Sequence, residues 1–174
     1  MIAEGQIRRI LKPRTDVVTV AADATIVHAV DQNIGSGVKD NYDQYRGSGN
    51  VGGTNTDSYL SLVPFEENST DYAALALKAT SGAGVDMTGP ASNSKVMCLS
   101  CHRAHASGFE YAVRWNPESE MLTYAGAWPG TDNGAPSQYA RGRTAAEMLA
   151  AYNDYPATTF ATYQRSLCNK CHVQ

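Results

Sequence analysis

The chain has 174 residues and is slightly acidic, with 14 Lys and Arg against 17 Asp and Glu. Its length predicts one domain. It has no basic patch interleaved with aromatics of the kind that binds nucleic acid, and no apolar stretch near the ~20 residues that span a bilayer. Fifteen glycines, with only three Phe and two Trp, predict a loop-rich protein.

Residues 1–65 contain the β-prone part of the chain. Val17–Val20 and Thr25–Val30 are rich in β-branched residues and predict short strands. The stretch from Gly35 to Gly53 is rich in Gly, Asn and Tyr, and it predicts an ordered loop or arm. Residues 66–174 instead predict short helices separated by loops. Capping residues mark their starts: Ser69–Asp71 for a helix to about Ala79, Asn93–Ser94, Thr144–Glu147, and Thr158 or Thr159 after a break at Pro156.

One pentapeptide pattern occurs twice, as Cys98-Leu99-Ser100-Cys101-His102 and as Cys168-Asn169-Lys170-Cys171-His172. On a helical turn, residues i, i+3 and i+4 share a face. Two thiols placed in this way can bond the two vinyl groups of one haem, and the imidazole that follows can bind its iron. Cys-x-x-Cys-His is the attachment signature of c-type haem, so two copies predict two covalently attached haems.

Two other uses of paired cysteines fit less well. A four-thiolate zinc site usually separates its pairs by about 15–20 residues, far fewer than lie between Cys101 and Cys168, and it gives no reason for a histidine after each pair. A redox disulfide usually stands beside a βαβ pattern, and the approach to neither pair has one.

The chain has four histidines, which match the four axial positions of two haems. With His102 and His172 as the proximal ligands, His28 and His105 remain for the other two positions. The most economical assignment is two bis-histidine haems. A methionine ligand is the alternative, but it would leave one histidine unused.

His105 follows His102 by only three residues, so the two rings cannot take opposite faces of one haem. We therefore expect His105 and His172 to bind the iron of haem 2, which would bring the two haems close together. His28 lies on the apolar face of a predicted strand, and we expect it to bind haem 1 in this chain or in a neighbouring subunit. A solvated His105 and an ordinary core His28 are the alternatives.

The segments 98–105 and 166–172 resemble the doubled CXXCH motif of multihaem c-type cytochromes, in which a CxxCHxxH segment is paired with a later Leu-Cys-x-x-Cys-His. This family is common among secreted cytochromes of bacteria and archaea, and some secreted members polymerise into extracellular filaments. The resemblance implies low-spin, bis-His haems that transfer electrons and bind no substrate.

Together these features predict a single loop-rich, mixed α+β domain over residues 1–174, with short N-terminal strands and a haem-binding part over 66–174, organised around two haems c. Candidates to pair with the haem propionates are Arg103, Arg141, Arg143, Arg165 and Lys170, whose alternative is a solvated surface. Among the aromatic residues, Trp115, Tyr124 and Trp128 are candidates to pack against haem, with ordinary core as the alternative.

The expected function is electron transfer, with a dihaem peroxidase or reductase as the alternative. The expected partners are other redox proteins or copies of the same chain in a filament, and an extracellular electron acceptor, without nucleic acid or a membrane span. Covalent haem attachment takes place outside the cytoplasm, so we expect an extracellular or cell-surface location. The first residues lack the basic and apolar regions of a secretion signal, and we expect that signal to have preceded them.

Overall fold

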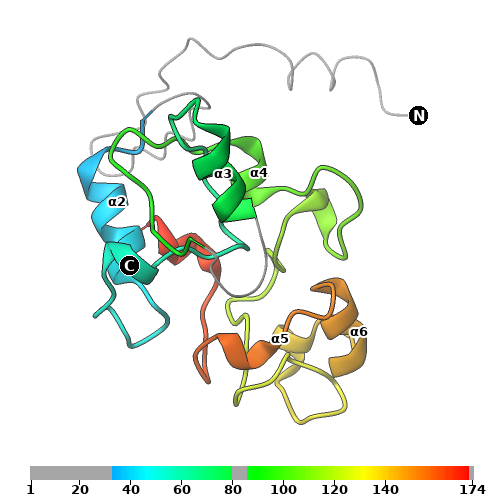
Figure 1. The fold of residues 1–174 in the computed structure, drawn as a ribbon. Helices are drawn as coiled ribbons and strands as arrows, with labels where there is room; N and C mark the ends of the chain where they lie inside the picture. The colour runs from blue at the N-terminus through cyan, green and yellow to red at the C-terminus, as the bar shows by residue number, and fades with distance from the viewer. Residues whose placement is uncertain (1–32, 80–85, 173–174) are drawn as a thin grey trace, which may run out of the picture.

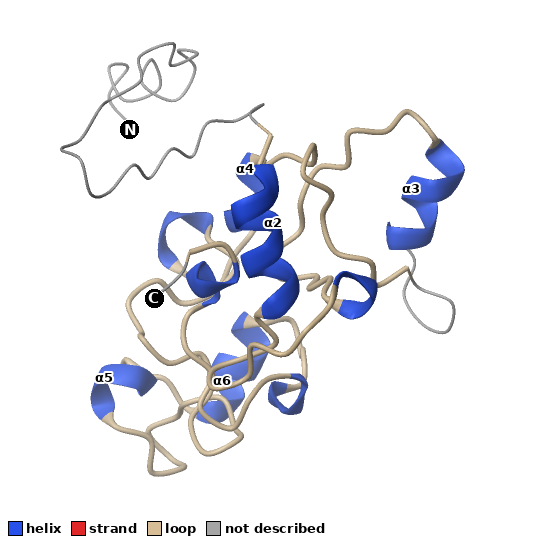
Figure 2. Cartoon of the chain, turned by 90° about the vertical axis from the view of Figure 1, so that its left-hand side faces the viewer, coloured by secondary structure: helices blue, strands red, loops and turns tan. Residues whose placement is uncertain are grey.

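The computed structural model describes residues 33–79 and 86–172, in which short helices are joined by long loops (Figures 1 and 2). The α-helices in these ranges are α2 (Gly35–Gln44), α3 (Tyr72–Ala79), α4 (Cys98–Cys101), α5 (Ser137–Ala140) and α6 (Ala145–Ala151). Single 3-10 turns are η1 (Asn55–Asp57), η2 (Glu110–Ala112), η3 (Ala157–Thr159) and η4 (Leu167–Lys170). Both views place α2 and α4 in one half of the molecule and α5 and α6 in the other. The loop-rich character predicted from the sequence is confirmed.

Strand pairing within the described ranges is limited to isolated bridges. Lys95 pairs with both Asn33 and Glu66, and Met121 pairs with Arg165. The predicted strands, Val17–Val20 and Thr25–Val30, lie outside the described residues. Over the described part of the chain, no helix is long and apolar enough to cross a bilayer.

The prediction of a loop or arm from Gly35 to Gly53 is wrong for residues 35–44, which form α2. The cause is side-chain interaction along one face of the helix. Lys39 and Asp43 form an i,i+4 ion pair of 2.8 Å. Tyr42 is buried, and its hydroxyl donates to the Val63 carbonyl at 2.8 Å. These contacts outweigh the low helix propensity of the glycines at its start.

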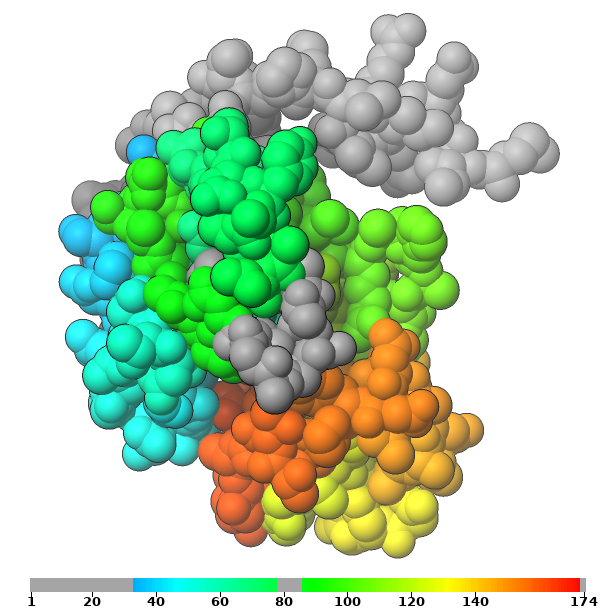
Figure 3. Space-filling view, viewed as in Figure 1, coloured from blue at the N-terminus to red at the C-terminus, as the bar shows by residue number. Residues whose placement is uncertain are grey.

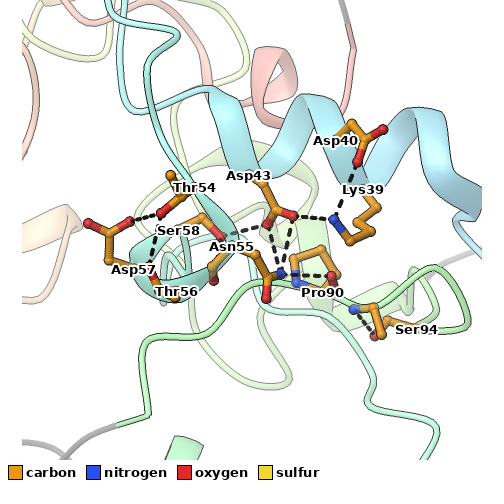
Figure 4. A network of polar contacts seen from close by, with 11 residues as sticks. Lys39, Asp40, Asp43, Thr54, Asn55, Thr56, Asp57, Ser58, Pro90 and Ser94 are labelled. Atoms are coloured by element: carbon orange, nitrogen blue, oxygen red, sulfur yellow. Dashed lines mark hydrogen bonds and ion pairs between the residues drawn. The ribbon is translucent and has the colours of Figure 1, made fainter.

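Asp43 also joins α2 to the loop that follows it (Figure 4). Its buried carboxylate accepts hydrogen bonds from Ser58 Oγ at 2.7 Å and from Asn55 Nδ2 at 3.2 Å. Asn55 Nδ2 also donates to the Pro90 carbonyl at 3.2 Å. Because every one of these partners is distant in sequence, the network fixes where α2 lies relative to the rest of the chain.

Two predicted helix starts are confirmed. Asp71 Oδ1 accepts from the backbone N–H groups of Ala73 and Ala74 at the start of α3. At the start of α6, Thr144 Oγ1 accepts from the Glu147 N–H, and the Glu147 carboxylate accepts from the Thr144 N–H, which completes the capping box. α3 lies on the outer surface (Figure 3).

Two other predicted helices are shorter than expected. The helix expected from Asn93 begins only at Cys98, because Ser94 is buried in a turn where its hydroxyl accepts from the Ala91 N–H. The helix expected after Pro156 is replaced by two separate 3-10 turns, η3 and η4. Between those turns the backbone pairs with residues 121–126 instead of with itself, for example through the Leu122 N–H and the Gln164 carbonyl at 2.7 Å.

The core of the half that contains α5 and α6 is aromatic. The ring of Trp128 stacks on Tyr152 with centroids 3.9 Å apart, and Phe109 lies 4.8 Å from the same tyrosine. Trp128 Nε1 donates to the Tyr155 carbonyl, and the Tyr152 hydroxyl accepts from the Asn116 N–H. This cluster joins the loop after α4, which contains Phe109, to the residues that follow α6.

Candidate haem-binding site

The first Cys-x-x-Cys-His segment is a single helical turn. Cys98 and Cys101 are the first and last residues of α4, and the His102 N–H donates to the Cys98 carbonyl at 2.9 Å. Cys98 is exposed and Cys101 is half-buried. The turn therefore presents two thiols and an imidazole from neighbouring positions, as the spacing predicted.

The His102 ring is held by the backbone of a loop. Its Nδ1 lies 2.8 Å from the Tyr111 carbonyl oxygen, and since a carbonyl only accepts, Nδ1 carries the proton. In the neutral ring, Nε2 then has the lone pair that a metal requires, and an imidazole held in this way by a backbone carbonyl is typical of a metal ligand. Tyr111 and Ala112 both have left-handed backbone conformations, with φ of 58° and 54°. This strained turn aims the Tyr111 carbonyl at the ring.

The same loop is fastened to the motif on both sides of His102. The Arg103 N–H donates to the Ala112 carbonyl at 2.7 Å, and the Arg114 N–H donates to the Cys101 carbonyl at 2.8 Å. The Arg114 guanidinium also donates to the Leu99 carbonyl. Sequence reasoning missed Tyr111 and Arg114, because nothing local connects them to the motif.

The second Cys-x-x-Cys-His segment repeats the hydrogen-bond register of the first. The His172 N–H donates to the Cys168 carbonyl at 3.0 Å, across the 3-10 turn η4. Cys168 is exposed and Cys171 is half-buried. Lys170 between them is buried, and burial lowers the pKa of its ammonium to about 8.

The two segments share one cavity of about 300 Å³. Its thiol and imidazole lining comes from Cys101 of the first segment and from Cys168, Cys171 and His172 of the second. Burial raises the pKa of the Cys101 thiol, to which the neighbouring Cys168 contributes, and burial raises the pKa of Cys171 to about 11. These half-buried thiols are therefore neutral at pH 7 and face an apolar space.

The rest of the cavity wall is almost entirely apolar. Side chains of α2, of the 63–65 loop and of the 113–117 loop supply it, chiefly Val38, Tyr42, Phe65, Val113 and Trp115. Ligand pockets of several hundred Å³ with apolar walls and a few polar groups suit planar organic cofactors. Trp115 thus lies where the sequence predicted a haem-packing group, whereas Trp128 belongs to the aromatic core.

Haem also carries two carboxylates. Two arginines beside the first motif, Arg103 and Arg114, are candidates to bind them. The Nε of Arg103 is buried without a hydrogen-bond partner. Burial lowers the pKa of Arg114, and the positive charge of Arg103 beside it lowers that pKa further. Two neighbouring guanidinium groups, one with an unused buried donor, fit a carboxylate-bearing cofactor. The residues present therefore fit haem.

The other predicted propionate partners have protein contacts. Arg141 forms an ion pair with Glu118 at 3.0 Å, and Arg165 pairs with Glu120 at 3.4 Å. Arg143 lies over the Phe109 ring.

Among the described residues, Cys98, His102 and His105 do not line the shared cavity. His105 is exposed, in the loop that follows α4. His28 lies outside the described residues. Their assignment as axial ligands stays a prediction.

Comparison with known proteins gives one relative and two solved structures. No protein-family model matches the chain. Over 140 residues, which are 76% of this chain and 31% of the relative, it is 46% identical to C-type cytochrome OmcS of Geobacter sulfurreducens.

The fold is similar to a cryo-EM structure of OmcS nanowires from Geobacter sulfurreducens, with a TM-score of 0.72 and 39% identity, over 87% of this chain and 38% of that one. It is also similar to a structure of the Outer Membrane Cytochrome S filament from the same organism, with a TM-score of 0.68 and 42% identity, over 80% of this chain and 35% of that one. The chain thus spans about a third of the length of the proteins it matches.

Cys-x-x-Cys-His is the attachment signature of c-type haem, and thiols of both copies line one apolar cavity. The resemblance to multihaem c-type cytochromes that the motifs predicted is confirmed, and the relative that carries it in both sequence and fold is OmcS.

Proposed function

We propose that this chain is a dihaem c-type cytochrome that transfers electrons. The observation that supports this most strongly is that Cys101 of the first Cys-x-x-Cys-His turn lines the same apolar cavity as Cys168, Cys171 and His172 of the second, because this brings the two attachment segments close together. The similarity to a c-type cytochrome over three quarters of the chain supports it independently.

In this proposal each motif holds one haem c through its two thiols, and His102 and His172 are the proximal ligands. His105 completes the coordination of haem 2 and His28 that of haem 1. Each haem, when bound, takes up and releases one electron at its iron. The chain itself orients the ligands, as the Tyr111 carbonyl does for His102, and keeps water out with the apolar wall around Cys101 and Cys171.

Arg103 and Arg114 bind the propionates of the haem on the first motif. Their guanidinium groups lie beside that motif, and Arg103 has a buried donor to offer. A carboxylate bound between the two guanidinium groups would offset the repulsion between their positive charges.

A carrier fits this site better than an enzyme does. The chain has four histidines, which would supply two imidazole ligands to each of two haems and would leave neither iron a position for a substrate. An oxidase, peroxidase or reductase needs an open or displaceable ligand position on its iron.

The extension of this proposal is that the protein works outside the cell as the subunit of a filament, passing electrons to an extracellular acceptor. It is supported by the two solved structures with the same fold, which are described as nanowires and as a filament. Copies of the chain and other redox proteins are then its partners.

The test is a pair of double variants measured for haem content. Cys98→Ser with Cys101→Ser removes the thiols of one motif, and Cys168→Ser with Cys171→Ser removes those of the other. Each is expected to reduce the haem bound per chain from two to one, measured by haemochrome absorbance against protein concentration. Unchanged haem content in both variants would contradict covalent attachment at these motifs.

Two further measurements separate the alternatives. Carbon monoxide added to the reduced protein at neutral pH should leave its spectrum unchanged, whereas a shifted spectrum would favour the enzyme. Electron micrographs of the purified protein should show filaments, and discrete particles alone would remove the filament extension while leaving electron transfer intact.

A further inference from the structure

The two haem motifs have different residues at a position that is buried in both. The residue before the second thiol is Ser100 in the first motif and Lys170 in the second. Both are buried, at 3% exposed. Ser100 is neutral, and its hydroxyl accepts from the Met97 N–H at 3.1 Å. Lys170 places an ammonium group at the same point of the other motif.

The Lys170 ammonium is held by neutral groups of α2 and the residue that follows it. Nζ donates to the Tyr45 carbonyl at 2.7 Å and lies over the Tyr42 ring, 4.4 Å from its centroid. Cation–π contact and a carbonyl acceptor both favour the charged form without neutralising it. On the other side of the motif, Asn41 Nδ2 donates to the carbonyls of Asn169 and Lys170. The turn is therefore fixed against α2 at several points.

The charges around Lys170 leave it uncompensated. Asp43 is the carboxylate that acts on Lys170 electrostatically, but its own ion pair is with Lys39 at 2.8 Å. Arg46, whose positive charge also acts on Lys170, pairs with Asp57. None of the ion pairs found among the described residues includes Lys170. Both carboxylates of α2, Asp40 and Asp43, pair with Lys39, so neither forms an ion pair with Lys170.

Tyr42 contacts both the Lys170 ammonium and the haem cavity. The same ring that Lys170 covers lines the cavity with Cys171 and His172. A unit charge in a region of low dielectric acts over distances of about 10 Å, so it reaches a group bound at the second motif.

We propose that the buried ammonium of Lys170 raises the reduction potential of the haem on the second motif above that of the haem on the first, an inference that rests on the proposed function. Reduction adds one electron to the ferric iron, giving ferrous iron with no other bond made or broken. A nearby positive charge stabilises the reduced form, whose net charge is lower by one. Charge and burial near a haem are established ways of setting its potential. Electrons that enter the pair at the first haem then move to the second.

The test is a spectroelectrochemical titration of the haem-loaded protein at pH 7, with both midpoint potentials fitted. Lys170→Met should lower the reduction potential of the haem on the second motif and leave that of the other haem unchanged. The equilibrium constant for reducing the second haem, divided by that for the first, should fall about tenfold. Lys170→Arg, which keeps the charge, should keep that ratio near the wild-type value. Arg141→Gln, which removes a surface cation paired with Glu118, is the control and should leave both potentials unchanged.

The result that would overturn the proposal is an unchanged ratio in Lys170→Met with two haems still bound, or an equal fall of both potentials. If Lys170→Met does not load its second haem, Lys170→Gln takes its place, and equal ratios in the Gln and Arg variants would overturn the proposal. Haem content separates this failure from a failure of the proposed function: a wild-type chain without haem contradicts the function, whereas unmoved potentials in a haem-loaded chain contradict only the role of Lys170.

Discussion

The Nδ1–H of His102 donates a 2.8 Å hydrogen bond to the backbone carbonyl of Tyr111, a residue nine positions further along the chain. The carbonyl comes from a backbone turn in which two consecutive non-glycine residues have positive φ. Such conformations cost about 1–3 kcal/mol each and persist where the surrounding structure enforces them. We read the strain as the means by which the loop orients an iron ligand.

This reading predicts opposite results for two substitutions at Tyr111. Proline cannot adopt a φ near 58°, so Tyr111→Pro should move the carbonyl and free the His102 ring. Glycine accepts that conformation readily, and because the Tyr111 side chain is 78% exposed, Tyr111→Gly should keep the hydrogen bond. Absorption and electron paramagnetic resonance spectra should show a high-spin fraction in the proline variant alone. Identical low-spin spectra in both would contradict the role of this carbonyl.

The arginine pair at the first motif should contribute to the stability of the haem-loaded protein. Removing the charged partner of a carboxylate typically costs about 1.5–3 kcal/mol, so Arg103→Gln and Arg114→Gln should each lower the free energy of unfolding by that order. Arg141→Gln, which breaks an exposed pair, should cost less than about 1 kcal/mol. Denaturant titration of the haem-loaded variants measures all three. Equal losses in Arg103→Gln and Arg141→Gln would show that Arg103 binds no propionate.

The buried tyrosines predict how stability depends on alkaline pH. Burial raises the pKa of Tyr42 and of Tyr152 well above the ordinary value of about 10. Above pH 10 the unfolded chain therefore loses phenolic protons that the folded chain retains, so stability that is full below pH 10 falls as the pH rises. The expected slope is about 1.4 kcal/mol per pH unit for each tyrosine.

The measurement is the free energy of unfolding of the wild type and of Tyr152→Phe at several pH values above 10. The variant also loses the acceptor of the Asn116 N–H, which lowers its stability at every pH, so the slope is the informative quantity. A slope in Tyr152→Phe as steep as that of the wild type would contradict the assignment.

The network around Asp43 predicts a contrast between two glycines. A methyl group at Gly89 would meet Ser58 Oγ and the Asp43 carboxylate, so Gly89→Ala should force that network apart (Figure 4) and cost about 1–3 kcal/mol. A methyl group at Gly37, within α2, meets nothing within 4 Å. Gly37→Ala should therefore stabilise the protein by about 0.5–1 kcal/mol. Thermal unfolding of both variants checks this, and a neutral Gly89→Ala would mean that the network contributes little.

The chemistry of the site was predictable from the sequence, because two thiols and an imidazole on one turn need only local spacing. The partners of that turn were not predictable. Tyr111, Arg114 and Tyr42 come to the motifs through pairing of loops and packing of α2, for which the sequence has no periodic signal. The same limit explains the fold. α2 was missed because its glycines obscure a helix that the Lys39–Asp43 ion pair and buried Tyr42 stabilise. The last helix was overpredicted because residues near Gln164 pair instead with the 121–126 segment.

The central claim is that two haems are covalently bound to this chain, and the mass of the intact protein under denaturing, non-reducing conditions tests it most directly. The account predicts a mass that exceeds that of the 174-residue polypeptide by two haem groups, with all four cysteines resistant to alkylation. A mass equal to the bare polypeptide, with four cysteines that react once denatured and reduced, would contradict it.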